Sequence, residues 1–281
     1  MSEKRSTDQS LLDALSGETR VLSIVGDPIA QVKSPAGMTQ ALRESGHNAV
    51  LVPMHVAQVD LDTHIRGFSV AKNVDGIIVT VPHKFGVYAH CTTTTDRSRF
   101  LGAVNVLRRN DDGSWHGDMR DGEGFVQGIR AMQFEPAGKR ALLIGAGGAG
   151  SAIALALLEA GVVALAIHDE DIVRRDSLIS RLQSIFPSKA SIGSDDPTGF
   201  DLVVNATPMG MKASDPSPVQ IDKLTSAMFV GDVITAPAVT PLIEAARAKG
   251  CNTQVGGGMF AAVRDLMLAF LLEAGPLALK Q

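Results

Sequence analysis

The sequence predicts a two-domain α/β protein, and three observations support this prediction. Apolar strand-like runs alternate with helix-like segments along most of the chain, an order typical of parallel sheets with right-handed crossovers. Hydrophobic residues make up 45% of the sequence but aromatic residues only 4%, and there are 28 glycines, a mixture that suits buried parallel strands and closely packed helices. The length of 281 residues corresponds to roughly two domains at about 150 residues each.

The first series of elements ends shortly after residue 80. Gly26-Asp27-Pro28 reads as a turn that closes the first strand, and Pro35 stands where a helix can begin. We expect strands at 21–25, 49–56 and 76–80 and helices at 36–45 and 60–69.

A second series begins after the polar connection at residues 135–139. It is separated from the first by the hairpin-type turn Asn110-Asp111-Asp112-Gly113, so we place a domain boundary in this region. A last helix at 260–272 follows with little chain left, and we expect it to pack back on the first domain or on the hinge. The expected strands of the second series are 140–144, 162–168, 202–205 and 228–233, and the expected helices are 150–160, 174–186 and 242–249.

A glycine-rich loop opens the second series. The apolar strand at 140–144 is followed by Gly145-Ala146-Gly147-Gly148-Ala149-Gly150 and then by an Ala/Leu-rich helix, which is the context that makes G-x-G-x-x-G indicative of dinucleotide binding. Gly145 permits the tight turn, Gly147 lets the backbone approach a pyrophosphate, and Gly150 allows close helix–strand packing. The helix N-terminus offers N–H donors and a positive dipole end to the phosphates. We therefore predict a Rossmann-type dinucleotide-binding domain.

The strand after this loop ends in acidic residues. Asp169 stands where the adenosine ribose is expected, with Asp171 as the second choice; a carboxylate accepts hydrogen bonds from ribose hydroxyls but repels a 2′-phosphate. We therefore expect NAD to be favoured over NADP. Arg174 and Arg175 are interpreted as a solvated helix face; the alternative, an arginine folded onto a 2′-phosphate, keeps NADP open.

A lysine and an aspartate form the candidate chemical site. Lys84 follows Val79-Thr80-Val81-Pro82-His83 at the end of a predicted strand, where ligands of open α/β sheets bind, and Asp121 lies where the chain passes between domains. Across a cleft they would make a proton-transfer pair, in which the amine exchanges a proton with an alcohol oxygen and the carboxylate orients it. Without further context, Lys84 is better interpreted as an ordinary surface charge and Asp121 as a turn residue.

Further segments occur in order around these features, and together they resemble the shikimate and quinate dehydrogenase family over residues 21–272. The matching segments are Gly26-Asp27-Pro28-Ile29 with Ser34-Pro35, Val79-Thr80-x-Pro82-x-Lys84, Gly102-Ala103-Val104-Asn105, residues 117–125 around Asp121, the Gly145 loop, residues 204–211, and Gly256-Gly257-Gly258-Met259.

The resemblance implies a two-domain oxidoreductase that acts on a CH–OH group. Its members use NAD or NADP to interconvert a ring hydroxyl and a ketone by hydride transfer, on shikimate or quinate. The implied catalytic residues are Lys84 and Asp121, and Ser34, Thr80 and Asn105 would contact substrate oxygens. The implied cofactor contacts beyond the glycine loop and Asp169 are Asn205, Ala206, Thr207, Met211, Val233, Gly256 and Met259.

The expected architecture follows. The first domain is an α/β substrate domain of residues 1–122, completed by the C-terminal helix within 257–281. The second is the dinucleotide-binding domain, residues 123–256.

The substrate pocket departs from the family at four positions. Where the family has two serines in the loop that binds the carboxylate, this chain has Val32 and Ser34. The family's glutamine on the last helix corresponds to Val263, its tyrosine after the last strand of the nucleotide domain to Thr235, and its asparagine before Val-Thr to Ile78. Each lost polar contact costs about 1–3 kcal/mol. Two alternatives therefore stay open: a dehydrogenase of the same fold for a different alicyclic hydroxy acid, and a non-catalytic ligand-sensing homologue.

Composition argues against several other classes. With 26 Lys and Arg against 30 Asp and Glu, the net charge of −4 disfavours a nucleic-acid partner. The two cysteines and seven histidines show no metal-ligand spacing, so no metal site is expected. No apolar run reaches a membrane-spanning length, and residues 1–10 lack the apolar centre of a signal peptide. We expect a cytoplasmic enzyme, monomeric or homodimeric, whose partner is a small cyclic hydroxy acid.

Overall fold

The structure is a computed structural model that describes residues 15–212 and 214–278, so the polar stretch at residues 1–10 lies outside the described residues. The chain divides into two compact units. Within the described ranges, unit 1 comprises residues 15–93, 106–117 and 268–278, and unit 2 comprises 94–105, 118–212 and 214–267.

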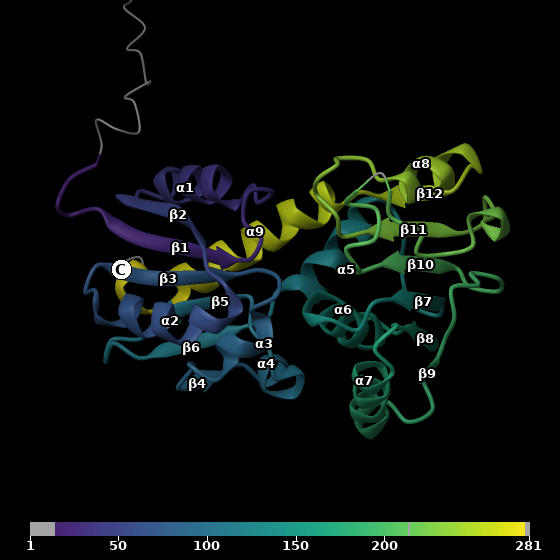
Figure 1. The fold of residues 1–281 in the computed structure, drawn as a ribbon, viewed down its shortest axis with the longest axis horizontal. Coiled ribbons are helices and arrows are strands. Elements are labelled where there is room, and N and C mark those ends of the chain that lie inside the picture. Colours follow the sequence, from purple (N-terminus) through teal and green to yellow (C-terminus); the bar gives the residue numbers. More distant parts are fainter. Residues whose placement is uncertain (1–14, 213, 279–281) are drawn as a thin grey trace, which may run out of the picture. The chain divides into compact units, whose positions relative to one another are not determined.

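Unit 1 contains a six-stranded sheet with the strand order β2-β1-β3-β5-β6-β4 (Figure 1). β1 pairs in parallel with both β2 and β3, as the alternation of strands and helices predicts. Every residue of β3 is buried, which fits its central place and its β-branched composition. The strands are β1 (Arg20–Gly26), β2 (Ala49–His55), β3 (Val74–Val79), β4 (Thr93–Thr94), β5 (Val106–Arg109) and β6 (Trp115–Asp118).

The second half of this sheet departs from the predicted parallel arrangement. β5 pairs antiparallel with β3, with Ile77 opposite Leu107. The turn between β5 and β6 is closed by the Gly113 N–H, which donates to the Asn110 carbonyl at 2.9 Å. Residues 110–114 join β5 to β6 by a short turn, whereas two parallel neighbouring strands need a long crossover connection. The all-parallel expectation was therefore wrong for this part of the sheet, although the turn itself was predicted.

The helices α1 (Ser34–Glu44), α2 (Leu61–Val70) and α3 (Lys84–Tyr88) accompany the sheet of unit 1, together with the end of the last helix, residues 268–273. α1 begins with Pro35 in its first turn, buries Met38 and Leu42 one turn apart, and packs on β2. α3 contacts α2. The helix α3 was not predicted, because five residues are too few to show a helical repeat.

Unit 2 contains a second six-stranded sheet, in the order β12-β11-β10-β7-β8-β9, and all five neighbouring pairs are parallel (Figure 1). The strands are β7 (Arg140–Ile144), β8 (Ala164–His168), β9 (Ala190–Ile192), β10 (Leu202–Asn205), β11 (Phe229–Asp232) and β12 (Asn252–Gln254). The helices are α4 (Asp96–Leu101), α5 (Asp121–Ala131), α6 (Gly148–Glu159), α7 (Ile172–Ile185), α8 (Pro241–Ala248) and the first twelve residues of α9 (Gly256–Glu273), which ends in unit 1.

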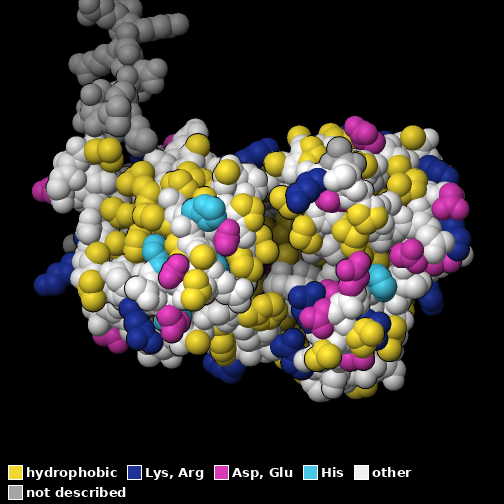
Figure 2. Space-filling model, in the orientation of Figure 1, with side chains coloured by type: hydrophobic (Ala, Val, Ile, Leu, Met, Phe, Trp, Pro, Cys, Tyr) yellow, Lys and Arg dark blue, Asp and Glu magenta, His cyan; other side chains and the backbone are white. Residues whose placement is uncertain are grey.

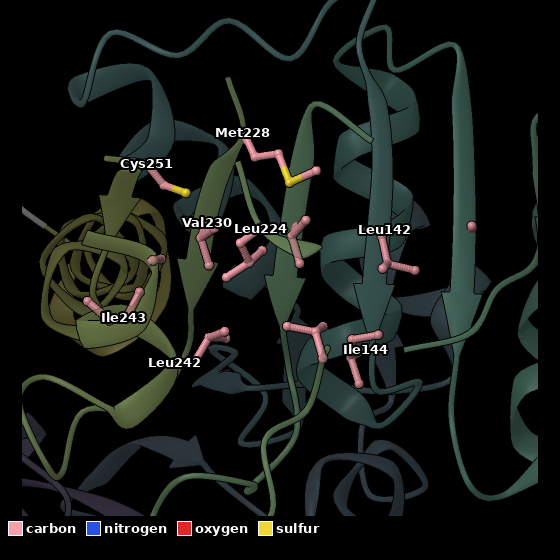
Figure 3. Close-up of a cluster of buried hydrophobic side chains, with 12 residues drawn as sticks. Leu142, Ile144, Leu224, Met228, Val230, Leu242, Ile243 and Cys251 are labelled. Carbon is pink, nitrogen blue, oxygen red and sulfur yellow. The ribbon is translucent and has the colours of Figure 1, made fainter. Parts of the chain in front are cut away.

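Two features hold unit 2 together. One sheet face packs on α8 through aliphatic side chains that include Ile144, Val230 and Ile243 (Figure 3). α5 packs closely on α6 and α9 because Gly122 and Gly124 have no side chain. A Cβ on Gly122 would overlap the Ala152 carbonyl, and one on Gly124 would overlap Val263. These contacts fix the start of α5, where Asp121 lies.

The surface carries charges of both signs. On the visible face of each unit, cationic and anionic side chains are interspersed with hydrophobic ones (Figure 2). Among helices of the described ranges, none combines the length and the hydropathy of a membrane-spanning segment.

Candidate active site

In unit 1, the predicted substrate residues lie on segments that leave the ends of β1 and β3. The Thr80 N–H donates to the Val25 carbonyl at 2.9 Å, and a Cβ on Gly26 would overlap the Thr80 side chain. Gly26 therefore lets Thr80 lie directly against the end of β1. Because β1 and β3 are parallel, their carboxyl ends meet at one edge, which is the usual ligand edge of such a sheet.

Ser34 and Val32 lie on the connection that follows β1. Ser34 is the first residue of α1, and the Val32 N–H donates to the Ile29 carbonyl at 3.2 Å in the preceding turn. Both side chains are half-buried. Ile78, in contrast, is fully buried within β3 and belongs to the core of unit 1.

Lys84 is the first residue of α3, so it starts a helix rather than lying in an open loop as predicted. It is half-buried. The preceding residue, His83, is only 1% exposed, and its Nε2 lies 2.7 Å from the Val56 carbonyl at the end of β2. No local pattern indicates a role for this histidine, because a single histidine in a Pro-containing segment gives no periodic signal. His83 anchors the start of the helix that carries Lys84.

In unit 2, Asp121 and Asn105 form a buried pair. The Asn105 Nδ2 donates to Asp121 Oδ1 at 2.6 Å, and the Asn105 Oδ1 accepts from the Arg120 N–H at 2.9 Å. Asn105 is fully buried and Asp121 is 6% exposed. The structure thus brings together two predicted site residues that lie sixteen positions apart.

The glycine loop has the geometry that pyrophosphate binding needs. Gly145 has φ +106, which favours glycine, and a Cβ on Gly150 would overlap the Gly145 carbonyl. A Cβ on Gly147 would meet nothing within 4 Å, so the backbone there is open to an approaching group. Gly147 precedes α6, a twelve-residue helix whose first turn includes Gly148 and Ala149. These residues fit a dinucleotide phosphate by backbone N–H donation and the helix dipole.

Asp169 is 8% exposed and is held by several donors. It accepts from the Ala146 N–H at 2.6 Å and the Asp171 N–H at 2.8 Å, and Arg174 reaches both of its oxygens, at 2.8 and 3.3 Å. Burial would raise the pKa of Asp169, but the bonds from Arg174 and the two amides outweigh it, and the pKa is lowered. The prediction that Arg174 is only part of a solvated face was wrong, because its guanidinium binds Asp169. The prediction was also wrong for Arg175, whose side chain is only 14% exposed.

Asn205 holds the loop that follows β10. Its Oδ1 accepts from the Thr207 N–H at 3.1 Å and from the Thr207 hydroxyl at 2.7 Å, and its Nδ2 donates to the Met209 carbonyl at 3.0 Å. The loop also carries Ala206, half-buried, and Met211, which is 36% exposed. Asn205 thus shapes the segment on which the other predicted cofactor contacts lie, and its own contact with a cofactor stays a prediction.

Asp232, at the end of β11, extends this network. Its carboxylate accepts from the Asn205 Nδ2 at 3.3 Å and the Thr240 hydroxyl at 2.7 Å. Burial raises the pKa of Asp232, against the effect of these bonds.

The remaining predicted residues surround the start of α9. A Cβ on Gly256 would overlap the backbone of Val233 and Ile234, so glycine lets α9 begin against the end of β11. Met259 and Val263 are buried, at 6% and 7% exposure, and Thr235 is half-buried. Val263 packs on Gly124 of α5, the helix whose first residue is Asp121.

In the ranges 15–212 and 214–278, no three His, Cys, Asp or Glu side chains gather in a way that would hold a metal ion.

Comparison with known proteins places these features in one family. The family described as "Shikimate dehydrogenase substrate binding domain" matches residues 24–107. The shikimate dehydrogenase (NADP(+)) of Geobacter metallireducens is 33% identical over 264 residues, which cover 91% of this chain and 92% of the relative.

Two solved structures are similar over almost the whole chain. The ligand-free 5-ketofructose reductase of Gluconobacter sp. strain CHM43 has a TM-score of 0.77 at 28% identity, covering 91% of this chain and 93% of that one. The shikimate 5-dehydrogenase of Listeria monocytogenes, solved with shikimate and NAD, has a TM-score of 0.81 at 25% identity, covering 94% and 95%. The chain belongs to the shikimate and quinate dehydrogenase family.

Proposed function

We propose that this protein is an NAD(P)-dependent oxidoreductase that interconverts a hydroxyl and a ketone on the ring of a cyclic hydroxy acid. The substrate pairs are shikimate and 3-dehydroshikimate, or quinate and dehydroquinate. The buried Asn105–Asp121 hydrogen bond of 2.6 Å carries the proposal. A carboxylate and a carboxamide held together at a helix start can orient a substrate hydroxyl. The names of the relatives support this substrate class.

The chain's own residues hold the substrate and move one proton. Lys84 exchanges the proton with the reacting oxygen, and Asp121 orients that oxygen. Thr80, Asn105 and Ser34 bind the other substrate oxygens. The dinucleotide, when bound to the Gly145 loop, supplies or accepts the hydride.

The proton-transfer role is tested with Lys84→Ala. We expect kcat to fall by about 10³-fold while KM for the dinucleotide changes less than about twofold, because loss of a general acid–base group typically costs 10²–10⁴-fold. Lys72→Ala, which alters an exposed lysine of the same unit, is the matched control and should keep the full kcat. A Lys84→Ala enzyme with most of its turnover would refute the assignment. Binding of dinucleotide and ligand by the wild type without any turnover would favour a ligand sensor.

For the cofactor, we propose a preference for NAD through Asp169. Its carboxylate can accept from the ribose diol when Arg174 gives up its bonds, whereas a 2′-phosphate would meet the negative charge. Steady-state kinetics with both cofactors test this: Asp169→Asn should lower kcat/KM for NAD and raise the relative use of NADP. Arg174→Gln should lower the use of NADP, because it removes the cation beside the ribose position. An unchanged NAD/NADP ratio in Asp169→Asn would contradict the preference.

A second candidate substrate is a polyhydroxylated ketone without the ring carboxylate. Val32 and Val263 are apolar where the family binds a carboxylate and a ring hydroxyl, and the 5-ketofructose reductase is similar over most of the chain. The two candidates separate in one assay of absorbance at the nicotinamide band, with shikimate, quinate, and polyols that lack a carboxylate. A kcat/KM at least about tenfold higher for the carboxylate-free substrates would favour the second candidate.

A further inference from the structure

Asp118 is a buried carboxylate that the proposed reaction does not use. It ends β6, three residues before Asp121, and it is 0% exposed. Its Oδ1 accepts from the Met119 N–H at 2.7 Å and from the Thr95 hydroxyl at 2.5 Å. An isolated buried carboxylate is costly, so its charge needs partners.

Two arginines supply those partners. Arg97 Nε lies 3.0 Å and Arg120 Nε 2.5 Å from the Asp118 oxygens. The same arginines reach Glu123 Oε2, at 2.8 and 2.9 Å. The four side chains balance two positive charges with two negative ones, and they join the start of α4, the end of β6 and the first turn of α5.

Backbone hydrogen bonds connect this cluster to the Asn105–Asp121 pair. The Asn105 N–H donates to the Asp118 carbonyl at 2.9 Å, and the Arg120 N–H donates to the Asn105 Oδ1 at 2.9 Å. Asn105 is therefore hydrogen-bonded to two backbone groups of the turn 118–121, the Asp118 carbonyl and the Arg120 N–H. Arg120 makes no side-chain cap for α5, but its ion pairs with Asp118 and Glu123 hold its side chain at this helix start.

We propose that Asp118, through Arg97 and Arg120, is a positioning residue that sets the orientation of Asn105 and Asp121 for proton transfer. The inference rests on the proposed function, in which Asp121 orients the reacting oxygen. Without the Asp118 charge, Arg97 and Arg120 each lose one ion-pair partner. The turn 118–121, whose backbone groups bind Asn105, is then held less firmly. A misplacement of about 1 Å in a catalytic group can cost about 10²-fold in rate.

The test uses Asp118→Asn in the full-length enzyme. Asparagine keeps an acceptor for the Met119 N–H and replaces the oxygen that faces Arg120 Nε with an uncharged NH2 group, so the charge that pairs with the arginines is lost. Active sites are counted by titration of dinucleotide fluorescence, so that kcat is obtained per active site. We expect kcat to fall about 10- to 100-fold, while KM for the dinucleotide stays within about twofold of the wild-type value. Glu135→Gln is the matched control: it removes a carboxylate from the exposed ion pair with Arg130 at the far end of α5 and should keep the full kcat.

A cycle with Asp121→Asn separates positioning from general stability. If Asp118 acts through Asp121, Asp118→Asn has little further effect on kcat in the Asp121→Asn background. A loss of equal factor in both backgrounds, or a lowered Tm with kcat per active site unchanged, would overturn the proposal. Should Asp118→Asn not fold, Arg97→Gln is expected to lower kcat about 3- to 10-fold with the same non-additivity, and additive loss would again refute it. If Asp121→Asn alone leaves kcat unchanged, the proposed function fails instead.

Discussion

At the scale of single residues, Gly147 and Gly150 differ in what a methyl group would meet. At Gly147 a Cβ meets nothing within 4 Å, while at Gly150 it overlaps the Gly145 carbonyl. We predict that Gly147→Ala keeps Tm within about 2 °C but raises KM for the dinucleotide about tenfold, because the methyl group occupies the approach of the pyrophosphate. Gly150→Ala should instead lower the free energy of unfolding by about 1–3 kcal/mol. Thermal melts and steady-state kinetics measure both; a normal KM in Gly147→Ala would exclude phosphate binding at this face.

Asp169 gives a prediction for pH. The pKa of Asp169 is lowered in the fold, so the unfolded state binds the proton more tightly than the folded state. The stabilisation from Asp169 is therefore present above the pKa of the unfolded state, about 3.9, and is lost as the pH falls through the pKa of the folded state. Asp169→Asn should therefore cost about 2 kcal/mol near neutral pH, and the difference from wild type should shrink on acidification below about pH 4. Urea unfolding at several pH values measures this difference. In an Arg174→Gln background the pH dependence should weaken, since the bond that lowers the pKa is absent; an unchanged dependence would assign the effect to the backbone amides.

At the scale of elements, Arg109 joins several pieces of unit 1. Its guanidinium donates to the carbonyls of Phe68, Ser69 and Ala71 at the end of α2, to Val74 on β3 at 2.6 Å, and to Gly113 in the β5–β6 turn at 2.9 Å, and it lies 4.4 Å from the centre of the Trp115 ring. We predict that Arg109→Lys lowers the free energy of unfolding by about 3 kcal/mol, because an ammonium cannot reach these acceptors together.

Urea denaturation measures the Arg109 effect, with Arg66→Lys as the control. Arg66 lies on α2, its side chain is 77% exposed, and its contact with Asp62 is 3.5 Å long. An exposed pair of this kind contributes little, so the change should stay within about 0.5 kcal/mol. Equal effects of the two substitutions would mean that the carbonyls around Arg109 find water instead.

The elements also show what a sequence pattern can predict. β7 and β10 have the predicted bounds, since each contains an uninterrupted apolar run, residues 141–144 in β7 and 202–204 in β10. The short elements β4, β5, β6, β9, β12, α3 and α4 were not predicted, because none of them contains a long apolar run or a full helical repeat. The helix α5 was not predicted either, because its three glycines weaken a helical pattern. For the site, the glycine loop was recognisable from local spacing. The bonds of Asp118 with Arg97, and of Arg174 with Asp169, depend on which segments the fold brings together, and no local pattern encodes them.

At the scale of the whole molecule, the domain boundaries predicted at 122/123 and 256/257 stay a prediction. Unit 2 also contains residues 94–105 and 257–267, and within it Gly124 packs on Val263 and Gly122 on Ala152. A fragment limited to 123–256 therefore lacks one side of the α5 packing and the whole Asn105–Asp121 pair.

We predict that the fragment 94–267, which spans unit 2 and the connecting residues 106–117 of unit 1, unfolds cooperatively and binds dinucleotide. The fragment 123–256 should be less stable by several kcal/mol, because losing the packing of α9 on α5 exposes buried apolar surface at about 25 cal/mol per Å². Urea unfolding and fluorescence titration with reduced dinucleotide measure both properties, and the full-length chain serves as the reference for affinity. If the two fragments are equally stable and bind equally well, the shorter boundaries define the independent domain, and the contacts of Val263 and Ala152 with α5 add nothing to its stability.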